Sequence, residues 1–267
     1  MALEASCAAH DSHVCVGLDP DLDALPAGFE PDPDDVLRFV AAIVEATAEF
    51  AAAYKPNSAF YEVMGPAGGE VLQAVIAAVP AGTPVILDAK RGDMRNTAER
   101  YATACFDVMG AGAATVNPYL GHDSLDPFLR RADRGVFVLC RTSNPDADML
   151  QTLEVNGGPL YLEVARWCRE WNSLGNVGLV CGATRPGDIA RVREVCPGQP
   201  ILVPGVGAQG GDLEAAAHAA AGAGRRHPFL VSASRSLAGA SRGGDYQHAA
   251  NFAADDLRRA IKRSLEA

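Results

Sequence analysis

Short apolar runs recur along the chain about every thirty residues, and most are separated by amphipathic, alanine-rich stretches with the period of a helix. The runs are apolar throughout rather than alternating, which is typical of strands in a parallel sheet covered on its face. The predicted strands are residues 13–18, 52–55, 84–90, 113–117, 135–141, 177–183, 200–204 and 228–234. The predicted helices begin near Pro33, Pro66, Asn96, Ser124, Gly158, Pro186, Gly210 and Asp245.

Several of these helices carry recognisable start signals. Pro33 and Pro186 suit a first helical turn. Asn96, with Glu99 three residues later, resembles a capping box and predicts that Asn96 caps its helix. Strands that alternate with helices indicate an α/β fold, and eight such units match the size of a closed (β/α)₈ TIM barrel. We therefore expect a single barrel domain over residues 1–267, with an open doubly wound sheet as the alternative.

Composition narrows the class of protein. Hydrophobic residues make up 48% of the chain and charged residues 21%, as in ordinary globular proteins. No apolar run approaches the roughly 18 residues of a membrane span, and the first residues do not resemble a secretion signal. The seven cysteines are scattered and form no C-x-x-C pair, which indicates reduced thiols. We therefore expect a cytoplasmic protein with no membrane partner.

The charge balance constrains the ligand. A net charge of −10 argues against a nucleic-acid partner, so an anionic substrate would need a local positive site. Of the 23 basic residues only Lys55, Lys90 and Lys262 are lysine. A lysine can give up its proton where an arginine cannot, and Lys55 and Lys90 each end a predicted strand.

A charged cluster ends the third predicted strand. Strand side chains alternate with period two, so Ile86, Asp88 and Lys90 should share the face that points into the barrel. Asp88 and Lys90 would each hold the other ionised, as a structural ion pair or as part of a catalytic centre. Asp93 follows in the next loop, either as a helix cap or as a member of that centre. Lys55 supplies an independent charge at a neighbouring strand end and favours the catalytic interpretation.

Two loops could bind other ligands. Residues 204–211 contain the G-x-G-x-x-G pattern of dinucleotide sites, but the acidic residue expected about twenty positions later is missing. The position after the seventh strand instead favours a phosphate site, with Gln209 and Arg235 as donors. Asp19 to Glu30 superficially copies a calcium loop, yet Ala24 replaces its required glycine. We expect no metal site.

With these features in place, the chain resembles the orotidine 5′-phosphate decarboxylases, and more closely their second, mycobacterial-like bacterial type. The resemblance spans nearly the whole chain. Its motifs are VGLD at 16–19, YKPNSAFYE at 54–62, DAKRGDMRNT at 88–97, NPYLG at 117–121, RTSN at 141–144, PGVGAQGG at 204–211 and SRS at 234–236. Their order and their placement at strand ends make the match specific.

The resemblance implies cofactor-free decarboxylation of orotidine 5′-monophosphate to uridine 5′-monophosphate, the last step of de novo pyrimidine nucleotide synthesis. It implies a charged array of Lys55, Asp88, Lys90 and Asp93, in which Lys90 protonates the carbanion left at C6. It also implies a homodimer with shared active sites, into which Asp93 and Thr97 reach from the partner chain.

The resemblance assigns the rest of the substrate as well. Asp19 and Lys55 would contact the ribose with Asn57 nearby, and Ser143 would bind the pyrimidine ring. Gln209 and Arg235 would grip the phosphate, and the loop after Pro204 would close over it.

Three alternatives compete with this hypothesis, two enzymes and one binding protein. A metal-dependent sugar-acid phosphate decarboxylase of the same superfamily shares the Asp-x-Lys-x-x-Asp pattern. That enzyme carries a metal-binding carboxylate at the end of the second strand, where this chain has Lys55. A Schiff-base aldolase on Lys90 would need a lowered lysine pKa, which Asp88 opposes. A non-catalytic phosphate-binding barrel leaves the charged strand ends unexplained.

Overall fold

Eight parallel strands form the centre of the molecule, in a computed structural model that describes residues 2–206, 210–224 and 227–266. The strands are β1 (Val14–Gly17), β2 (Ala51–Lys55), β3 (Ile86–Arg91), β4 (Ala113–Val116), β5 (Gly135–Arg141), β8 (Val177–Cys181), β9 (Ile201–Pro204) and β10 (Phe229–Ala233). They pair in the order β2-β1-β10-β9-β8-β5-β4-β3. Parallel bridges from Tyr54 to Val85 and from Asn57 to Asp88 join the two end strands. The sheet therefore closes, which confirms the predicted TIM barrel and excludes the open doubly wound alternative.

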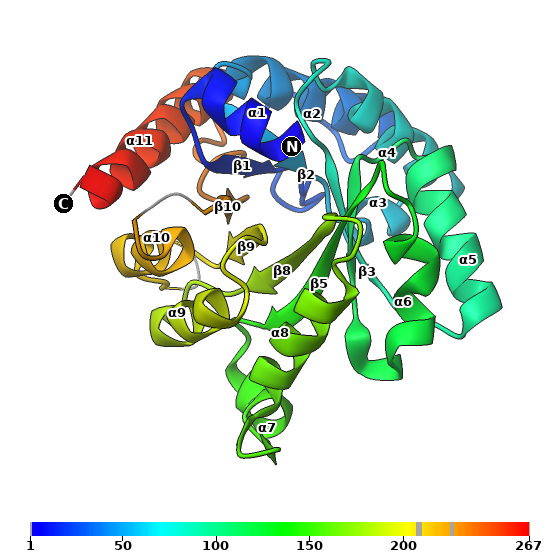
Figure 1. Cartoon of the computed structure of the whole chain (residues 1–267). Helices are drawn as coiled ribbons and strands as arrows, with labels where there is room; N and C mark the ends of the chain where they lie inside the picture. The colour runs from blue at the N-terminus through cyan, green and yellow to red at the C-terminus, as the bar shows by residue number, and fades with distance from the viewer. Residues whose placement is uncertain (1, 207–209, 225–226, 267) are drawn as a thin grey trace.

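Helices surround the barrel on the outside (Figure 1). Those that follow the strands are α2 (Pro33–Thr47), α4 (Pro66–Ala78), α5 (Arg95–Thr103), α6 (His122–Leu129), α8 (Leu160–Trp171), α9 (Pro186–Val195), α10 (Leu213–Ala221) and α11 (Tyr246–Glu266). Shorter additions are α3 (Ala59–Glu62), α7 (Asp148–Gln151), the antiparallel pair β6 (Glu154–Val155) and β7 (Gly158–Pro159), and the turns η1 (Ala104–Val108), η2 (Pro118–Leu120) and η3 (Pro145–Ala147).

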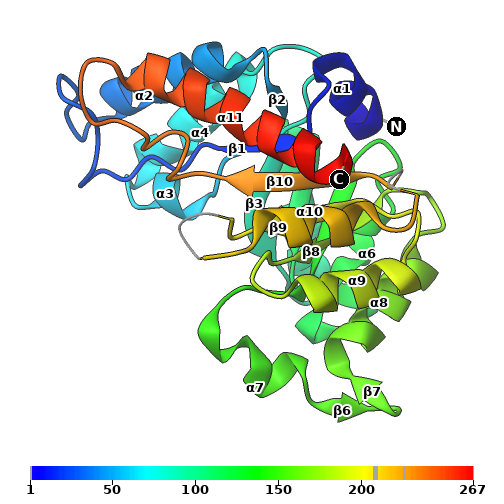
Figure 2. The ribbon, with the colours of Figure 1, turned by 90° about the vertical axis from the view of Figure 1, so that its left-hand side faces the viewer.

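The amino-terminal helix α1 (Ala2–His10) has no counterpart among the predicted elements. It packs beside β2, where the Ser6 hydroxyl donates to the Ala52 carbonyl at 2.8 Å. Figure 2 shows both chain ends on the side opposite to the arrowhead of β10. This helix therefore lies at the end of the barrel away from the carboxyl ends of the strands.

Five predicted helix starts differ from the structure, among them Ser124, whose helix begins at His122, and Asp245, whose helix begins at Tyr246. The helix near Asn96 begins at Arg95 and is preceded by Met94, so Asn96 lies inside the first turn and the predicted cap is wrong. A capping residue needs a non-helical backbone, which a position within the helix does not have. Gly158 belongs to the β6–β7 hairpin and its helix begins at Leu160, whereas α10 begins after its own cap, Asp212.

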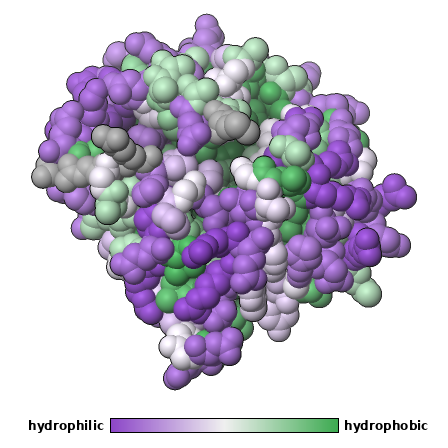
Figure 3. Space-filling view, viewed as in Figure 1, coloured by the Kyte–Doolittle hydropathy of each residue, from purple (hydrophilic) through white to green (hydrophobic). Residues whose placement is uncertain are grey.

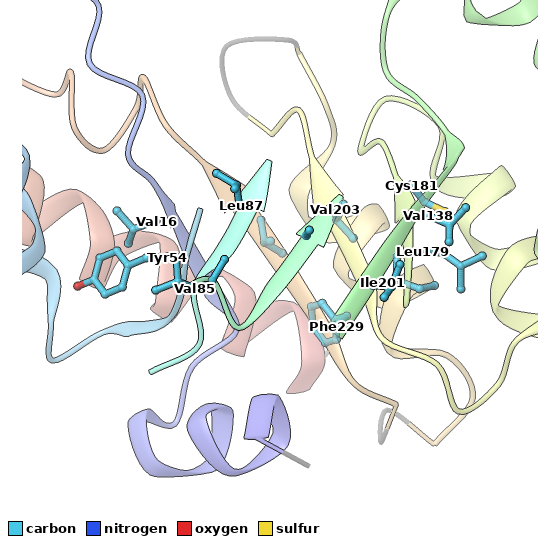
Figure 4. Close-up of a cluster of buried hydrophobic side chains, with 14 of the residues drawn as sticks. Val16, Tyr54, Val85, Leu87, Val138, Leu179, Cys181, Ile201, Val203 and Phe229 are labelled. Atoms are coloured by element: carbon cyan, nitrogen blue, oxygen red, sulfur yellow. The ribbon is translucent and has the colours of Figure 1, made fainter. Parts of the chain in front are cut away.

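Alternate strand residues form two apolar layers. Cys15, Phe137 and Leu202 belong to a small cluster that fills the barrel interior. Their neighbours belong to a larger cluster between the strands and the helices, part of which is drawn in Figure 4, with Val138 and Val203 among its labelled members. Both faces of each strand are thus buried, which explains why the sequence shows continuous apolar runs.

The outer surface is mostly hydrophilic on the face shown in Figure 3, with hydrophobic residues in small separate patches. Among the residues that the structure describes, no helix combines the length and apolar character needed to cross a membrane.

Candidate active site

A cavity of about 740 Å³ opens at the carboxyl ends of the strands. This is the size range of small-molecule sites, and it is the end of a barrel at which active sites form. Eight of the predicted site residues line it: Asp19, Lys55, Asn57, Asp88, Lys90, Ser143, Pro204 and Arg235. The structure therefore brings together residues from six strands that lie up to about 200 positions apart in the chain.

Asp88 is the hub of the charged residues in this cavity. Its Oδ2 accepts a hydrogen bond from Lys55 Nζ at 2.9 Å, and its Oδ1 accepts one from Lys90 Nζ at 2.7 Å. Asp88 and Lys55 are buried, whereas the Lys90 side chain is 48% exposed and faces the open cavity. One carboxylate thus holds two ammonium groups in a charge-assisted pair of contacts.

The pKa values of this cluster favour its charged form. Burial alone would raise the pKa of Asp88, but Lys55 and Lys90 outweigh it and hold that pKa well below its ordinary value. Burial would likewise lower the pKa of Lys55, but Asp88 and Asp19 outweigh it and raise that pKa. Asp88 and Lys55 are therefore ionised together at neutral pH.

The backbone of β3 departs from a regular strand just where Lys90 stands. Lys90 has a φ of +47°, in the left-handed region, and the pairing of β3 with β4 shifts register between Leu87 and Arg91. The Lys90 N–H donates to Thr115 Oγ1 at 2.9 Å instead of continuing the ladder. The direction of the Lys90 side chain is therefore not set by simple period-two alternation. Strained backbone conformations of this kind tend to occur at functional sites.

Thr115 is a site residue that sequence reasoning missed. Besides accepting from the Lys90 backbone, its hydroxyl donates to Asp88 Oδ1 at 2.8 Å from the neighbouring strand β4. It is 1% exposed. A signal was available: Thr115 is a polar residue in an apolar predicted strand, two positions from the inward-facing Ala113.

Asp19 is fixed by contacts on both carboxylate oxygens. Oδ1 accepts from the Asn57 backbone N–H at 3.0 Å, and Oδ2 accepts from the Ser234 hydroxyl at 2.7 Å. Ser234 approaches closely because residue 17 is glycine: a Cβ there would stand 1.8 Å from Ser234 Oγ. The loops after β1, β2 and β10 are thereby locked together around one carboxylate.

Pro204 and Arg235 lie at the β9–β10 side of the cavity. The predicted phosphate donor Gln209 lies outside the described residues. Asp93 and Thr97 do not belong to the lining of this cavity. Asp93 accepts a hydrogen bond from the Met94 N–H at 2.7 Å, and Thr97 is exposed on α5.

The calcium-like loop shows no ligand geometry: its first residue, Asp19, is held by Asn57 and Ser234. Within the described parts of the chain, no three His, Cys, Asp or Glu side chains gather as metal ligands would. What the cavity offers instead is a fixed pair of ammonium groups on one carboxylate. Such an arrangement can stabilise developing negative charge and supply a proton.

Comparisons with known proteins show the family of the chain. The model of the orotidine 5′-phosphate decarboxylase / HUMPS family matches residues 12–246. A Roseiflexus castenholzii protein named orotidine 5′-phosphate decarboxylase is 49% identical over 268 residues, covering 100% of this chain and 98% of that protein. A protein of the same name from Thermomicrobium roseum is 49% identical over 98% of this chain and 94% of its own.

Among solved structures, that of the Leishmania donovani OMP decarboxylase superposes with a TM-score of 0.87 at 42% identity. The match covers 100% of this chain and 98% of that one. A family model that spans most of the chain, full-length relatives and a shared barrel lead to one conclusion. The chain belongs to the orotidine 5′-phosphate decarboxylase / HUMPS family.

Proposed function

We propose that this barrel decarboxylates orotidine 5′-monophosphate to uridine 5′-monophosphate in the cavity that Lys90 faces. The observation that carries the proposal is the Lys55–Asp88–Lys90 cluster at the mouth of a barrel whose relatives are named for this activity. A non-catalytic barrel would have no use for a buried carboxylate shared by two ammonium groups, which is costly unless it serves the site.

The chemical step uses only side chains of the protein. The bond between C6 and the carboxylate carbon breaks, carbon dioxide leaves, and the electron pair remains on C6. The Lys90 ammonium stabilises this carbanion and then donates a proton to C6, giving the product. Asp88 orients Lys90 and, as a second anion, crowds the substrate carboxylate.

The substrate spans the cavity. Arg235 and Pro204, on the β9–β10 side, take the phosphate, while Asp19, Lys55 and Asn57 take the ribose. Gln209 is proposed as a further phosphate donor. Ser143, after β5, takes the pyrimidine ring. Phosphate binding is remote from C6, so its free energy is available for positioning the reacting carbon.

A homodimer completes the site in this proposal, with Asp93 and Thr97 reaching the partner's cavity. Large hydrophobic side chains are exposed after three neighbouring strands: Val63 is 69% exposed, Met94 74% and Tyr119 78%. Exposed apolar groups gathered beside a functional surface are typical of interfaces. Their position next to Asp93 supports a partner chain on this side of the barrel.

Two finer proposals accompany this one. The segment from η3 to β7, inserted between β5 and α8, supports assignment to the second, mycobacterial-like type, in which this segment is long. A cytoplasmic location is supported by the cysteines, all seven of which are free thiols.

The direct test is to incubate the purified protein with orotidine 5′-monophosphate and to measure both products. We expect uridine 5′-monophosphate and carbon dioxide in equal amounts. A protein that binds the nucleotide without forming either product would be a binding barrel, contrary to this proposal.

A further inference from the structure

A second polar network lies beside the cavity, and the decarboxylation step does not use it. Its centre is Arg141, the last residue of β5, which is 2% exposed. Its Nε donates to Asp188 Oδ2 of α9 at 2.7 Å, and its Nη2 donates to Asp148 of α7. Tyr161 of α8 donates to the other oxygen of Asp188 at 2.9 Å. Three outer helices therefore fix this guanidinium at the end of β5.

The third contact of Arg141 sets the orientation of Gln151. Arg141 Nη1 donates to Gln151 Oε1 at 3.2 Å, and the Thr142 N–H donates to the same oxygen at 2.9 Å. A guanidinium and a backbone N–H can only donate, so the oxygen of the amide must face them. The amide nitrogen of Gln151 then points to Thr142 Oγ1 and donates to it at 2.8 Å.

The direction of donation continues toward the cavity. Thr142 Oγ1 accepts from Gln151, so its own proton goes to Asn144 Oδ1, which is 2.6 Å away. Among the described residues, the amide nitrogen of Asn144 has no hydrogen-bond acceptor, so it is the unused end. Thr142, Asn144 and Gln151 all line the cavity, next to Ser143. The chain from Arg141 through Gln151 and Thr142 to Asn144, here called the donor chain, therefore presents a donor there.

We propose that Asn144 is a specificity-determining residue whose Nδ2 donates to the C4 carbonyl oxygen of the pyrimidine, and that Arg141 is the positioning residue that fixes this polarity. The inference rests on the proposed function and names how that site reads its base. With the phosphate at β9–β10 and C6 at Lys90, the carbonyl edge of the ring faces the wall that follows β5. A hydrogen-bond donor there favours uracil, which has a carbonyl at C4, and disfavours cytosine, which carries an amino group at C4.

The direction of hydrogen-bond donation along the donor chain can be reversed by an isosteric change, Gln151→Glu. A carboxylate still accepts from Arg141 and from the Thr142 N–H, but it cannot donate to Thr142 Oγ1. The Thr142 hydroxyl then donates to residue 151 and accepts from Asn144 Nδ2, which turns the Asn144 oxygen toward the cavity. The readout is the ratio of the dissociation constants of uridine 5′-monophosphate and cytidine 5′-monophosphate, in which a general repulsion of nucleotides by the added charge cancels.

We expect the wild type to prefer the uridine nucleotide by at least about 10-fold, as one mismatched hydrogen bond implies. Gln151→Glu should bring the ratio to about 1 or below. Thr142→Val, which breaks the donor chain without reversing it, should give an intermediate ratio. Glu154→Gln, in the exposed hairpin outside the cavity, is the matched control and should keep the wild-type ratio.

Thermal unfolding of each variant shows that it is folded before binding is measured. A uridine-to-cytidine ratio that stays at the wild-type value in both Gln151→Glu and Thr142→Val would overturn the inference, while the wild type still decarboxylates orotidine 5′-monophosphate. Failure of the wild type to decarboxylate its substrate would instead overturn the proposed function, so the two failures are distinguishable.

Discussion

Asp88 shows why the charges of this site had to be considered as a group. The sequence places Asp88 and Lys90 on one strand, and Lys55 elsewhere, but the carboxylate bonds one lysine through each oxygen. Burial alone would neutralise these groups; their mutual attraction keeps them charged. Their roles could be proposed from residue type and strand ends. The sequence carried a signal for Thr115, a polar residue in an apolar strand, but not its partner, because its hydroxyl contacts Asp88 across two neighbouring strands.

The pH dependence follows from the direction of these shifts. Asp88 has a folded-state pKa below its ordinary value of about 3.9, so the stabilisation it contributes is complete above pH about 4 and is lost as pH falls through the folded-state pKa. The pKa of Lys55 is raised in the folded state, so the stabilisation that Lys55 contributes is lost only at alkaline pH. We predict that an NMR titration of the Asp88 carboxyl will give a midpoint below the ordinary aspartate pKa of about 3.9. A midpoint above pH 4 would contradict the charged array.

Arg193 is a buried cation whose partners are carbonyl groups. It is 4% exposed, and burial lowers its pKa to about 10. Its guanidinium donates to carbonyls of Ala220 at 2.7 Å, Gln199 at 2.7 Å and Pro228 at 3.0 Å, among others. It therefore ties the ends of α9 and α10 to the strands β9 and β10.

We predict that Arg193→Met lowers the free energy of unfolding by at least about 3 kcal/mol, because several buried carbonyls lose their donor. Urea denaturation measures this. The control is Arg191→Met on the same helix, where the exposed guanidinium lies over Tyr161; it should cost less than about 1 kcal/mol. Equal losses in the two variants would show that the carbonyl contacts carry no special weight.

At the scale of elements, the strands were predictable because both of their faces are buried and their apolar runs are continuous. The ends of the helices were less predictable. Asn96 had the right residue type for a cap, but β3 ends in an irregular turn and α5 starts one residue earlier. Helix α1 carries no strong pattern of its own, since its place depends on packing beside β2. Contacts between distant segments decide such features, and sequence patterns do not contain them.

The loop after β5 depends on a glycine in the next strand unit. A Cβ on Gly182 would stand 2.7 Å from Ser143 Cβ and 2.8 Å from Ser143 N. We predict that Gly182→Ala displaces this loop and raises the KM for orotidine 5′-monophosphate about 10-fold or more, because about 1 Å of misplacement is costly in a site.

Gly187→Ala is the matched control, since no atom of the described residues lies within 4 Å of a Cβ at that position in α9. Its KM should equal that of the wild type. If both variants bind substrate normally, the loop after β5 tolerates displacement, and Ser143 has no close role in binding.

At the scale of the whole molecule, the closed barrel and its cavity agree with the sequence prediction. The bridge from Asn57 to Asp88, which helps to close it, lies within the site itself. The predicted array is divided, however: Lys55, Asp88 and Lys90 meet in one chain, whereas Asp93 bonds Met94 outside the cavity lining. A second chain would account for this division, as the proposed homodimer requires.

Mixed dimers test the shared site. We predict that Lys90→Ala and Asp93→Ala chains are each inactive alone but recover about a quarter of wild-type activity when refolded together in equal amounts, since half of the dimers then hold one intact site. Mixing wild-type chains with themselves under the same protocol controls for refolding. Mixtures that stay as inactive as their components would place both residues in the same chain's site.

The central claim is that Lys90 performs this decarboxylation without a metal ion. Its most direct test is the loss of orotate absorbance when the purified protein meets orotidine 5′-monophosphate in excess chelator. We predict full turnover by the wild type and by Lys262→Ala, whose exposed lysine pairs with Asp11 far from the cavity. Lys90→Ala should be slower by at least about 10³-fold, with product affinity largely retained. Turnover only after adding magnesium, or normal turnover by Lys90→Ala, would contradict the account.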